Sequence, residues 1–113
     1  MKKIEAIIKP FKLSQVKEAL HELGISGMTL VDVKGFGRQR GSTGGIDPND
    51  GYDDEFLAKM KLEVIVEDIQ VDDVIESIKT SAYSGKIGDG KIFVSNIEQV
   101  IRIRTGEKDS DAV

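Results

Sequence analysis

The sequence predicts an α+β fold in which strands and helices follow the order βαββαβ. Four segments alternate between apolar and polar residues, which is typical of half-buried strands. Two further segments place apolar residues three and four positions apart, which is typical of helices that cover a sheet. This order is the ferredoxin-like arrangement, a sandwich of an antiparallel sheet with both helices on one face. At 113 residues, we expect a single domain over residues 1–113 with one core.

The first half of the chain is expected to form strand, helix and strand. Residues 3–9 alternate, and Pro10 ends that strand. Residues 13–23 have the apolar spacing of a helix, and Gly24 is a natural stop because glycine readily takes the left-handed conformation that ends many helices. Residues 28–34 alternate again, so we expect the second strand there.

The second half repeats this order. Residues 57–66 alternate strongly and should pair with the preceding strand across a long loop. Asp68 is a candidate helix cap, followed by a helix over residues 71–82. Residues 91–95 form the last expected strand. Each half therefore contains strand, helix and strand, and each also contains a glycine-rich basic segment.

The composition favours a soluble, cytoplasmic protein. The chain has no cysteine, which excludes disulfides, thiolate metal sites and a cysteine nucleophile. Residues 1–9 carry charges where a signal peptide needs an apolar region, and the apolar runs are too short to span a bilayer. The net charge is −4, from 20 acidic and 16 basic residues, so a general nucleic-acid surface is not expected.

The most distinctive segment is 84–91, with the sequence Ser-Gly-Lys-Ile-Gly-Asp-Gly-Lys. Its glycines allow positive φ angles and bring N–H groups close to a ligand, and its lysines attract phosphate or carboxylate oxygens. The spacing from Gly85 to Lys91 matches a P-loop, but Ile92 stands where that loop needs Ser or Thr, and a strand follows where it needs a helix. The segment predicts an anion site that is not a P-loop NTPase, although glycine-rich turns also occur without a ligand.

Two other segments carry basic residues. Residues 35–41 join three glycines to two arginines, and residues 42–51 contain few apolar groups, so we expect a long functional loop there. Residues 100–104 alternate like a strand, with isoleucines that we expect to be buried. Arg102 and Arg104 would then point the same way, which is typical of a phosphate clamp.

Four segments together form a more specific pattern than any one glycine loop. They are residues 1–13 (Met-Lys-Lys-Ile-Glu-Ala-Ile-Ile-Lys-Pro-Phe-Lys-Leu), 33–41, 85–94 and 100–106 (Val-Ile-Arg-Ile-Arg-Thr-Gly). In this order they resemble the distinctive stretches of the PII signal-transduction proteins, over nearly the whole chain.

The resemblance implies a homotrimeric regulator and not an enzyme, in which slow ATP hydrolysis would be incidental. ATP or ADP would bind in clefts between subunits, and 2-oxoglutarate would bind together with Mg-ATP. A T-loop at about residues 37–56 would dock on partner proteins, either nitrogen-metabolism enzymes or a transporter, so that membrane contact would be indirect. A B-loop at about 83–91 and a C-terminal segment at about 100–113 would complete the binding site.

The resemblance also implies which residues bind. Nucleotide contacts would come from Thr29, Gly35, Gly37, Arg38, Val64, Gly88, Asp89, Gly90, Lys91, Arg102 and Arg104. Contacts to 2-oxoglutarate would come from Gln39, Gly41, Lys59 and Gly88. Gln39 would also give a side-chain oxygen to Mg²⁺, a hard cation that prefers oxygen ligands. The resemblance alone selects Lys59, because Lys61 shares its strand face and by pattern either lysine could simply face solvent.

The T-loop departs from the family pattern. Nitrogen regulators of this family usually carry a segment like Arg-Gly-x-Glu-Tyr, whereas this chain has Asp-Pro-Asn-Asp-Gly-Tyr at 47–52, followed by acidic residues. Tyr52 is the candidate site of uridylylation, and the acidic tip favours a basic partner surface. The alternative is a specialised PII-like protein whose loop regulates a different transporter or enzyme, or which senses another anion such as bicarbonate. A third interpretation, a small ferredoxin-like enzyme, is disfavoured because the sequence shows no evident acid/base pair for catalysis.

Overall fold

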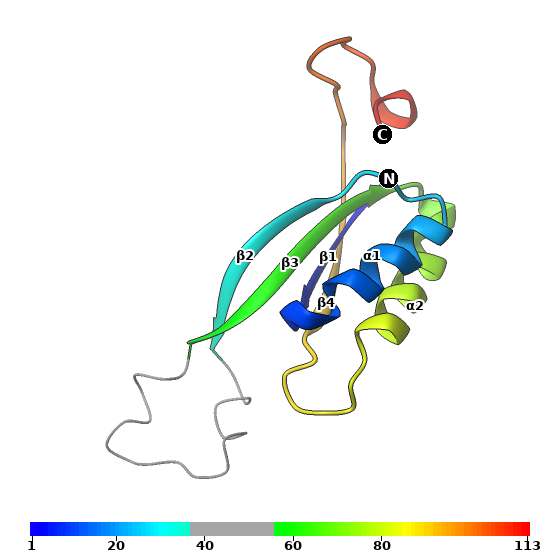
Figure 1. Cartoon of the computed structure of the whole chain (residues 1–113). Helices are drawn as coiled ribbons and strands as arrows, with labels where there is room; N and C mark the ends of the chain where they lie inside the picture. Colours follow the sequence, from blue (N-terminus) through cyan, green and yellow to red (C-terminus); the bar gives the residue numbers. More distant parts are fainter. Residues whose placement is uncertain (37–55) are drawn as a thin grey trace.

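The computed structural model describes residues 1–36 and 56–113, and its elements follow the predicted order (Figure 1). The strands and helices are β1 (Lys2–Ile8), α1 (Leu13–Glu22), β2 (Thr29–Phe36), β3 (Phe56–Val66), α2 (Val71–Ala82) and β4 (Lys91–Asn96). Short 3₁₀ helices lie at Pro10–Lys12, Asp68–Gln70 and Asp109–Ala112. The prediction of a ferredoxin-like α+β fold is confirmed, and the predicted elements of the βαββαβ order lie close to their expected bounds.

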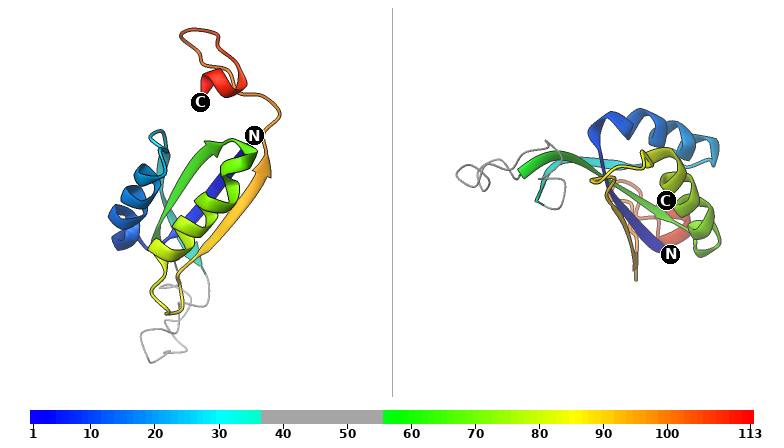
Figure 2. Two further views of the ribbon diagram at one scale, coloured as in Figure 1. Left: turned by 90° about the vertical axis from the view of Figure 1, so that its right-hand side faces the viewer. Right: turned by 90° about the horizontal axis from the view of Figure 1, so that it is seen from below.

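The strands form an antiparallel sheet in the order β2-β3-β1-β4, and both helices lie on one face of it (Figure 2). β1 lies between β3 and β4, so that Ile4 pairs with Val64 on one side and Val94 on the other. Because successive side chains of a strand point to opposite faces, every second residue of β1 and β3 turns towards the helices. This geometry explains why alternation in the sequence predicted the strands correctly.

The core lies between the sheet and the two helices. Its buried apolar residues are Ile4, Ala6, Ile8, Val16, Leu20, Ile25, Leu62, Val64, Val66, Val74, Ile78 and Ala82. The buried residues of each helix are four positions apart, so each helix turns one stripe towards the sheet. Fully burying one aliphatic side chain of this size contributes about 1.5–3 kcal/mol, so the shared row of apolar residues fixes both helices on this face.

The start of the second helical segment differs from the prediction. Glu67, and not Asp68, is the capping residue, and it forms a capping box with Gln70. Asp68 instead contacts the Met1 ammonium and Lys2 Nζ, each at 3.0 Å. Hydrogen bonds from Lys2 and from the ammonium group lower the pKa of Asp68. The expected stop of α1 is confirmed, since Gly24 follows the helix with a φ of 83°.

The two ends of the sheet carry different connections. At the end that we call the B-loop end, residues 83–90 lead into β4, and β2 and β3 extend to the pair Phe36 and Phe56. At the opposite end, Lys2 pairs with Val66, and the C-terminal segment projects beyond the sheet (Figure 1). We call this the C-terminal end.

Candidate functional site

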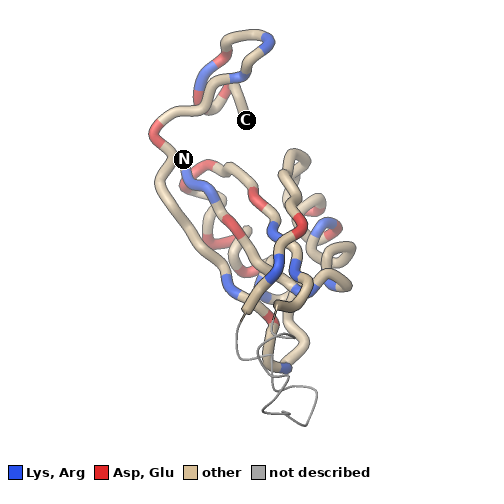
Figure 3. The backbone as a smooth tube through the Cα atoms, turned by 90° about the vertical axis from the view of Figure 1, so that its left-hand side faces the viewer, with Lys and Arg blue, Asp and Glu red and all other residues tan. Residues whose placement is uncertain are grey.

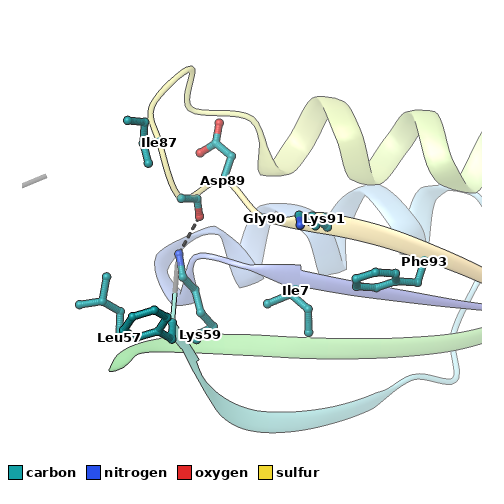
Figure 4. Close-up of a pocket in the computed structure, with 11 residues that line it drawn as sticks. Ile7, Leu57, Lys59, Ile87, Asp89, Gly90, Lys91 and Phe93 are labelled. Carbon is teal, nitrogen blue, oxygen red and sulfur yellow. Dashed lines mark hydrogen bonds between the residues drawn. The ribbon is translucent and has the colours of Figure 1, made fainter. Parts of the chain in front are cut away.

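A pocket of about 630 Å³ lies at the B-loop end (Figure 4). It is lined by Ile7, Gly35, Phe36, Leu57, Lys59, Ile87, Gly88, Asp89, Gly90, Lys91 and Phe93. Ile8 is buried in the core, so the neighbouring Ile7 points to the face of the sheet opposite the helices. Lys59 and Lys91 lie on that same face by register. The pocket therefore combines apolar sheet residues, two lysines and a stretch of glycine backbone.

The B-loop (residues 83–91) bends at three glycines with positive φ. Gly85 has a φ of 81°, Gly88 of 98° and Gly90 of 97°, which L-residues rarely adopt. Gly90 also packs against β1, because a Cβ at this position would lie 1.6 Å from the carbonyl oxygen of Ile7. The glycines are therefore required by the loop itself, before any ligand is considered. β4 follows directly at Lys91, as expected of a loop that is not a P-loop.

A partly buried polar cluster holds the B-loop to the end of β1. Lys9, which is 6% exposed, places Nζ 3.1 Å from Ser84 Oγ and 3.3 Å from Asp89 Oδ1. The Ser84 hydroxyl donates to Asp89 Oδ1, and the N–H groups of Ser84 and Gly85 donate to Oδ2 at 2.8 and 2.9 Å. Both carboxylate oxygens of Asp89 are thus occupied by protein donors.

The environment of Asp89 favours its charged form. Partial burial by itself raises the pKa of the carboxyl, but hydrogen bonds from the Ser84 hydroxyl, from two N–H groups and from Lys9 outweigh it. As a result, the pKa of Asp89 lies well below its ordinary value of 3.8. The opposite charges of Lys9 and Asp89 compensate one another, whereas a charge without a partner at this place would be costly.

Lys59 is the buried lysine on the wall of the pocket. It is 8% exposed, and its Nζ donates to the carbonyl oxygen of Gly88 at 2.6 Å. Burial lowers the pKa of Lys59, the charge of Lys9 lowers it further, and the charge of Asp89 acts in the opposite direction. Lys61, on the same strand face, instead pairs with Glu63 at 3.3 Å. The structure thus distinguishes two lysines that the sequence pattern could not separate.

The structure brings together six of the predicted binding residues. They all line the pocket: Gly35, Lys59, Gly88, Asp89, Gly90 and Lys91. Two others lie towards the C-terminal end, where Thr29 pairs with Glu63 and Val64 follows along β3. The side chain of Val64 is buried in the core at 1% exposure, so within this chain it is not available to hold a base. Asp89 lines the pocket, but its carboxylate accepts hydrogen bonds from N–H groups of the loop itself.

Several predicted residues lie outside the described residues. They are Gly37, Arg38, Gln39, Gly41 and Tyr52. The predicted Mg²⁺ ligand and the predicted modification site therefore remain predictions.

The C-terminal segment differs from the expected strand. Its isoleucines are exposed and not buried, with Ile101 at 53% and Ile103 at 98%. The backbone turns at residues 102–107, where Arg102 N donates to the Glu107 carbonyl at 2.9 Å and Gly106 N donates to the Arg102 carbonyl at 2.8 Å. The Arg102 guanidinium pairs with Glu107 at 3.0 Å. The alternation failed as a predictor because the segment projects beyond the sheet.

Lys9 contacts the B-loop but was not predicted to do so, and Ser84 was predicted only as part of segment 84–91, without a role of its own. Lys9 ends an alternating strand at a position of the same parity as Lys3 and Glu5, so its pattern indicated a solvated charge. Ser84 stands next to Gly85 and resembles an ordinary turn residue. The signal that could have found them is chemical, since a loop with one acidic residue among glycines needs donors for that carboxylate.

The fold and the site define a class of protein. The class is a ferredoxin-like protein with a loop-lined pocket at one end of the sheet. Over residues 1–36 and 56–113, there is no cluster of His, Cys, Asp and Glu suited to a metal ion. Acidic and basic residues are interspersed along this part of the chain (Figure 3), and none of its helices is long and apolar enough to cross a membrane.

Comparison with known proteins identifies the family within this class. The family model of nitrogen regulatory protein P-II matches residues 1–107. Nitrogen regulatory proteins P-II of Azospirillum brasilense and Pasteurella multocida are each 58% identical to this chain over 113 residues, covering 100% of both chains. The crystal structure of Arabidopsis thaliana PII bound to citrate superimposes with a TM-score of 0.82 at 43% identity, covering 99% of this chain and 91% of that one. The chain belongs to the P-II family of signal-transduction regulators.

Proposed function

We propose that this protein binds ATP or ADP between the subunits of a homotrimer and binds 2-oxoglutarate together with Mg-ATP. Occupancy of these sites then controls, through the T-loop at residues 37–56, a partner protein of nitrogen or carbon metabolism. The observation that carries the proposal is the pocket at the B-loop end. Its lysines and glycine backbone are the groups that bind phosphate and carboxylate oxygens.

The separation of the predicted contacts supports a site between subunits. Gly35 pairs with Leu57 and Thr29 pairs with Glu63, so the two sets lie six residues apart along β3, about 20 Å in an extended strand. A nucleotide that contacts both sets is most simply placed between two chains. One chain would then supply the contacts near Gly35, and the other chain would supply the contacts near Thr29. The exposed isoleucines of the C-terminal segment support the same arrangement, because a neighbouring subunit would cover them.

Lys59 is suited to bind the 2-oxoglutarate carboxylate. Its Nζ already lies at the pocket wall and donates to Gly88, so an incoming carboxylate would meet a positioned cation. For Mg²⁺, the described residues hold no cluster of acidic or histidine ligands. Its proposed oxygen ligands are the Gln39 side chain, the phosphates and 2-oxoglutarate, which suits a hard cation that prefers oxygen.

Calorimetry on the purified protein tests this function. ATP is titrated alone, and 2-oxoglutarate is titrated with and without Mg-ATP, while light scattering gives the mass of the assembly. We expect saturable ATP binding, 2-oxoglutarate binding that depends on Mg-ATP, and the mass of three chains. A monomer, or a protein that does not bind ATP, would overturn the proposal.

The acidic sequence of the T-loop favours a second candidate, a regulator whose effector is bicarbonate or whose partner is a different transporter. The same calorimeter separates the two. A protein that binds bicarbonate but not 2-oxoglutarate supports the bicarbonate effector of the second candidate. A protein that binds 2-oxoglutarate but not bicarbonate supports the first candidate. Uridylylation of Tyr52 is tested by mass spectrometry of the protein from nitrogen-starved cells, in which an added uridylyl mass on that residue is expected.

A further inference from the structure

The partly buried cluster of Lys9, Ser84 and Asp89 has no role in the function proposed so far. Asp89 was predicted to contact the nucleotide, but its two oxygens contact four protein donors, namely Lys9 Nζ, the Ser84 hydroxyl and the N–H groups of Ser84 and Gly85. Figure 4 shows the Asp89 carboxyl pointing away from Lys59. A carboxylate turned towards phosphate would repel it, whereas this one is neutralised by Lys9 within the protein.

The cluster joins the two ends of the loop to an inner strand of the sheet. Ser84 lies near the start of the B-loop and Asp89 near its end, so their hydrogen bonds close the loop at its neck. Lys9 directly follows β1, which lies between β3 and β4 in the sheet. Through Lys9, the neck is held to a strand 75 residues away in sequence.

The parts of the loop that face the pocket depend on this neck. Gly85, Gly88 and Gly90 all have positive φ, and glycine backbone is the most costly to order because it has the most freedom when unfolded. Between the two ends of the neck, the Gly88 carbonyl accepts from Lys59 at 2.6 Å. Just beyond the neck, Gly90 leaves no room for a Cβ against Ile7. Small displacements of the neck would therefore move both the backbone donors and the Lys59 ammonium.

We propose that Lys9, Ser84 and Asp89 are positioning residues that hold the B-loop in its binding geometry before the ligand arrives. They act without contacting nucleotide or 2-oxoglutarate. This inference rests on the proposed function, because it assigns the cluster a role in ligand affinity. Preformed sites bind more tightly because the cost of ordering the loop is met during folding.

The test measures ATP affinity and loop exchange in Asp89→Asn and Lys9→Met. Each variant removes one charge of the pair at nearly constant size. We expect ATP affinity to fall about tenfold or more, the scale of a lost charge-assisted hydrogen bond. We also expect the peptide spanning residues 83–91 to exchange its amide hydrogens faster in the absence of ligand. Lys9→Arg keeps the charge and should restore part of the affinity.

The matched control is Glu76→Gln, which breaks the exposed pair of Glu76 and Lys79 on α2 at 3.7 Å. It should leave ATP affinity and loop exchange unchanged. If Asp89→Asn does not fold, Ser84→Ala removes one donor and leaves the ion pair, and a smaller loss of affinity is then expected, with Ser84→Thr restoring it.

The possible results separate this inference from the proposed function. Unchanged ATP affinity in the folded variants, with normal binding by the wild-type protein, would overturn the positioning role. A wild-type protein that binds no ATP would overturn the proposed function and, with it, the role in affinity. Loop exchange measured without ligand would still decide whether the cluster orders the B-loop.

Discussion

The two ends of the sheet each hold an ion pair, and the pairs differ in their surroundings more than in their distances. Lys9 and Asp89 lie 3.3 Å apart with side chains 8% and 24% exposed, whereas Arg102 and Glu107 lie 3.0 Å apart with both side chains 44% exposed. Exposed pairs contribute about 0–1 kcal/mol, while breaking a buried pair leaves an uncompensated charge. We therefore expect the loss of one partner to cost more at the less exposed pair, although its distance is longer.

The two ends also differ in how far their residues contact one another within one chain. At the B-loop end, the glycine backbone, the buried lysines and Asp89 contact one another within one chain. At the C-terminal end, Ile103 is 98% exposed, and the segment that carries Arg102 and Arg104 extends beyond the sheet (Figure 1). The first arrangement is held by contacts within one chain, and the second is typical of a surface that another chain covers.

The largest effect is expected at Gly90, where the B-loop packs against β1. In Gly90→Ala, the new Cβ would lie 1.6 Å from the Ile7 carbonyl oxygen, and the residue would keep a φ of 97°. Because a backbone atom cannot move aside cheaply, we expect a loss of about 3 kcal/mol or more in the free energy of unfolding, measured with urea.

Gly27→Ala is the matched control for this change. A Cβ at Gly27 meets nothing within 4 Å, so its free energy of unfolding should stay within about 0.5 kcal/mol of the wild-type value. If Gly90→Ala were equally harmless, the close contact between the B-loop and β1 would be wrong.

The opposite behaviour is expected at the C-terminal end. Arg104→Ala should leave the melting temperature nearly unchanged, because the side chain is exposed. It should weaken ATP binding by about 1.5–3 kcal/mol, since the proposed charged contact to phosphate would be lost. Calorimetry measures the affinity, and Lys79→Ala on α2, where the side chain is 70% exposed, is the control. Unchanged ATP affinity would show that this arginine does not contact the nucleotide.

Much of the B-loop end could be predicted from sequence. Apolar alternation and helical spacing report which residues are buried, so they placed β1 to β4 and both helices. The glycines and lysines of residues 84–91 predicted the loop, because positive φ angles favour glycine and anion binding favours lysine. Lys59 needed the family resemblance, since a strand face holds solvated and buried lysines with the same spacing.

The remaining features could not be predicted because they depend on distant contacts or on another chain. Lys9 is buried by a loop 75 residues away, which no local pattern reports. No local pattern reports whether the Asp89 carboxylate faces a ligand or the loop, and in the structure it contacts N–H groups of the loop and Lys9. Ile101 and Ile103 alternate like core residues but project beyond the sheet, so their apolar character is not matched by burial within this chain.

Acid should reduce the contribution of the pair of Lys9 and Asp89 to stability. The pKa of Asp89 in the folded protein lies below its ordinary value of 3.8, so its stabilisation is fully present above that pH and is lost as pH falls below it. Urea unfolding of wild-type protein and Asp89→Asn should therefore differ by about 1–2 kcal/mol at neutral pH, and by less near pH 3. Other carboxylates titrate in both proteins and cancel in the difference. If the difference in free energy of unfolding between the two proteins does not decrease at low pH, the Asp89 carboxylate is not held in its charged form by these donors.

The smallest effect is expected from the exposed pair. Glu107→Gln removes the charge that faces Arg102, but both side chains are 44% exposed and water replaces the lost interaction. The amide oxygen of Gln can still accept the Thr105 hydroxyl, which now donates to Glu107 at 2.7 Å. We therefore expect the free energy of unfolding to change by less than about 1 kcal/mol, and by less still in high salt, where the wild-type pair is itself screened. Unfolding in urea at two salt concentrations measures this. A larger, salt-independent loss would contradict the exposure of this pair and would indicate that assembly buries it, making the C-terminal end as tightly built as the B-loop end.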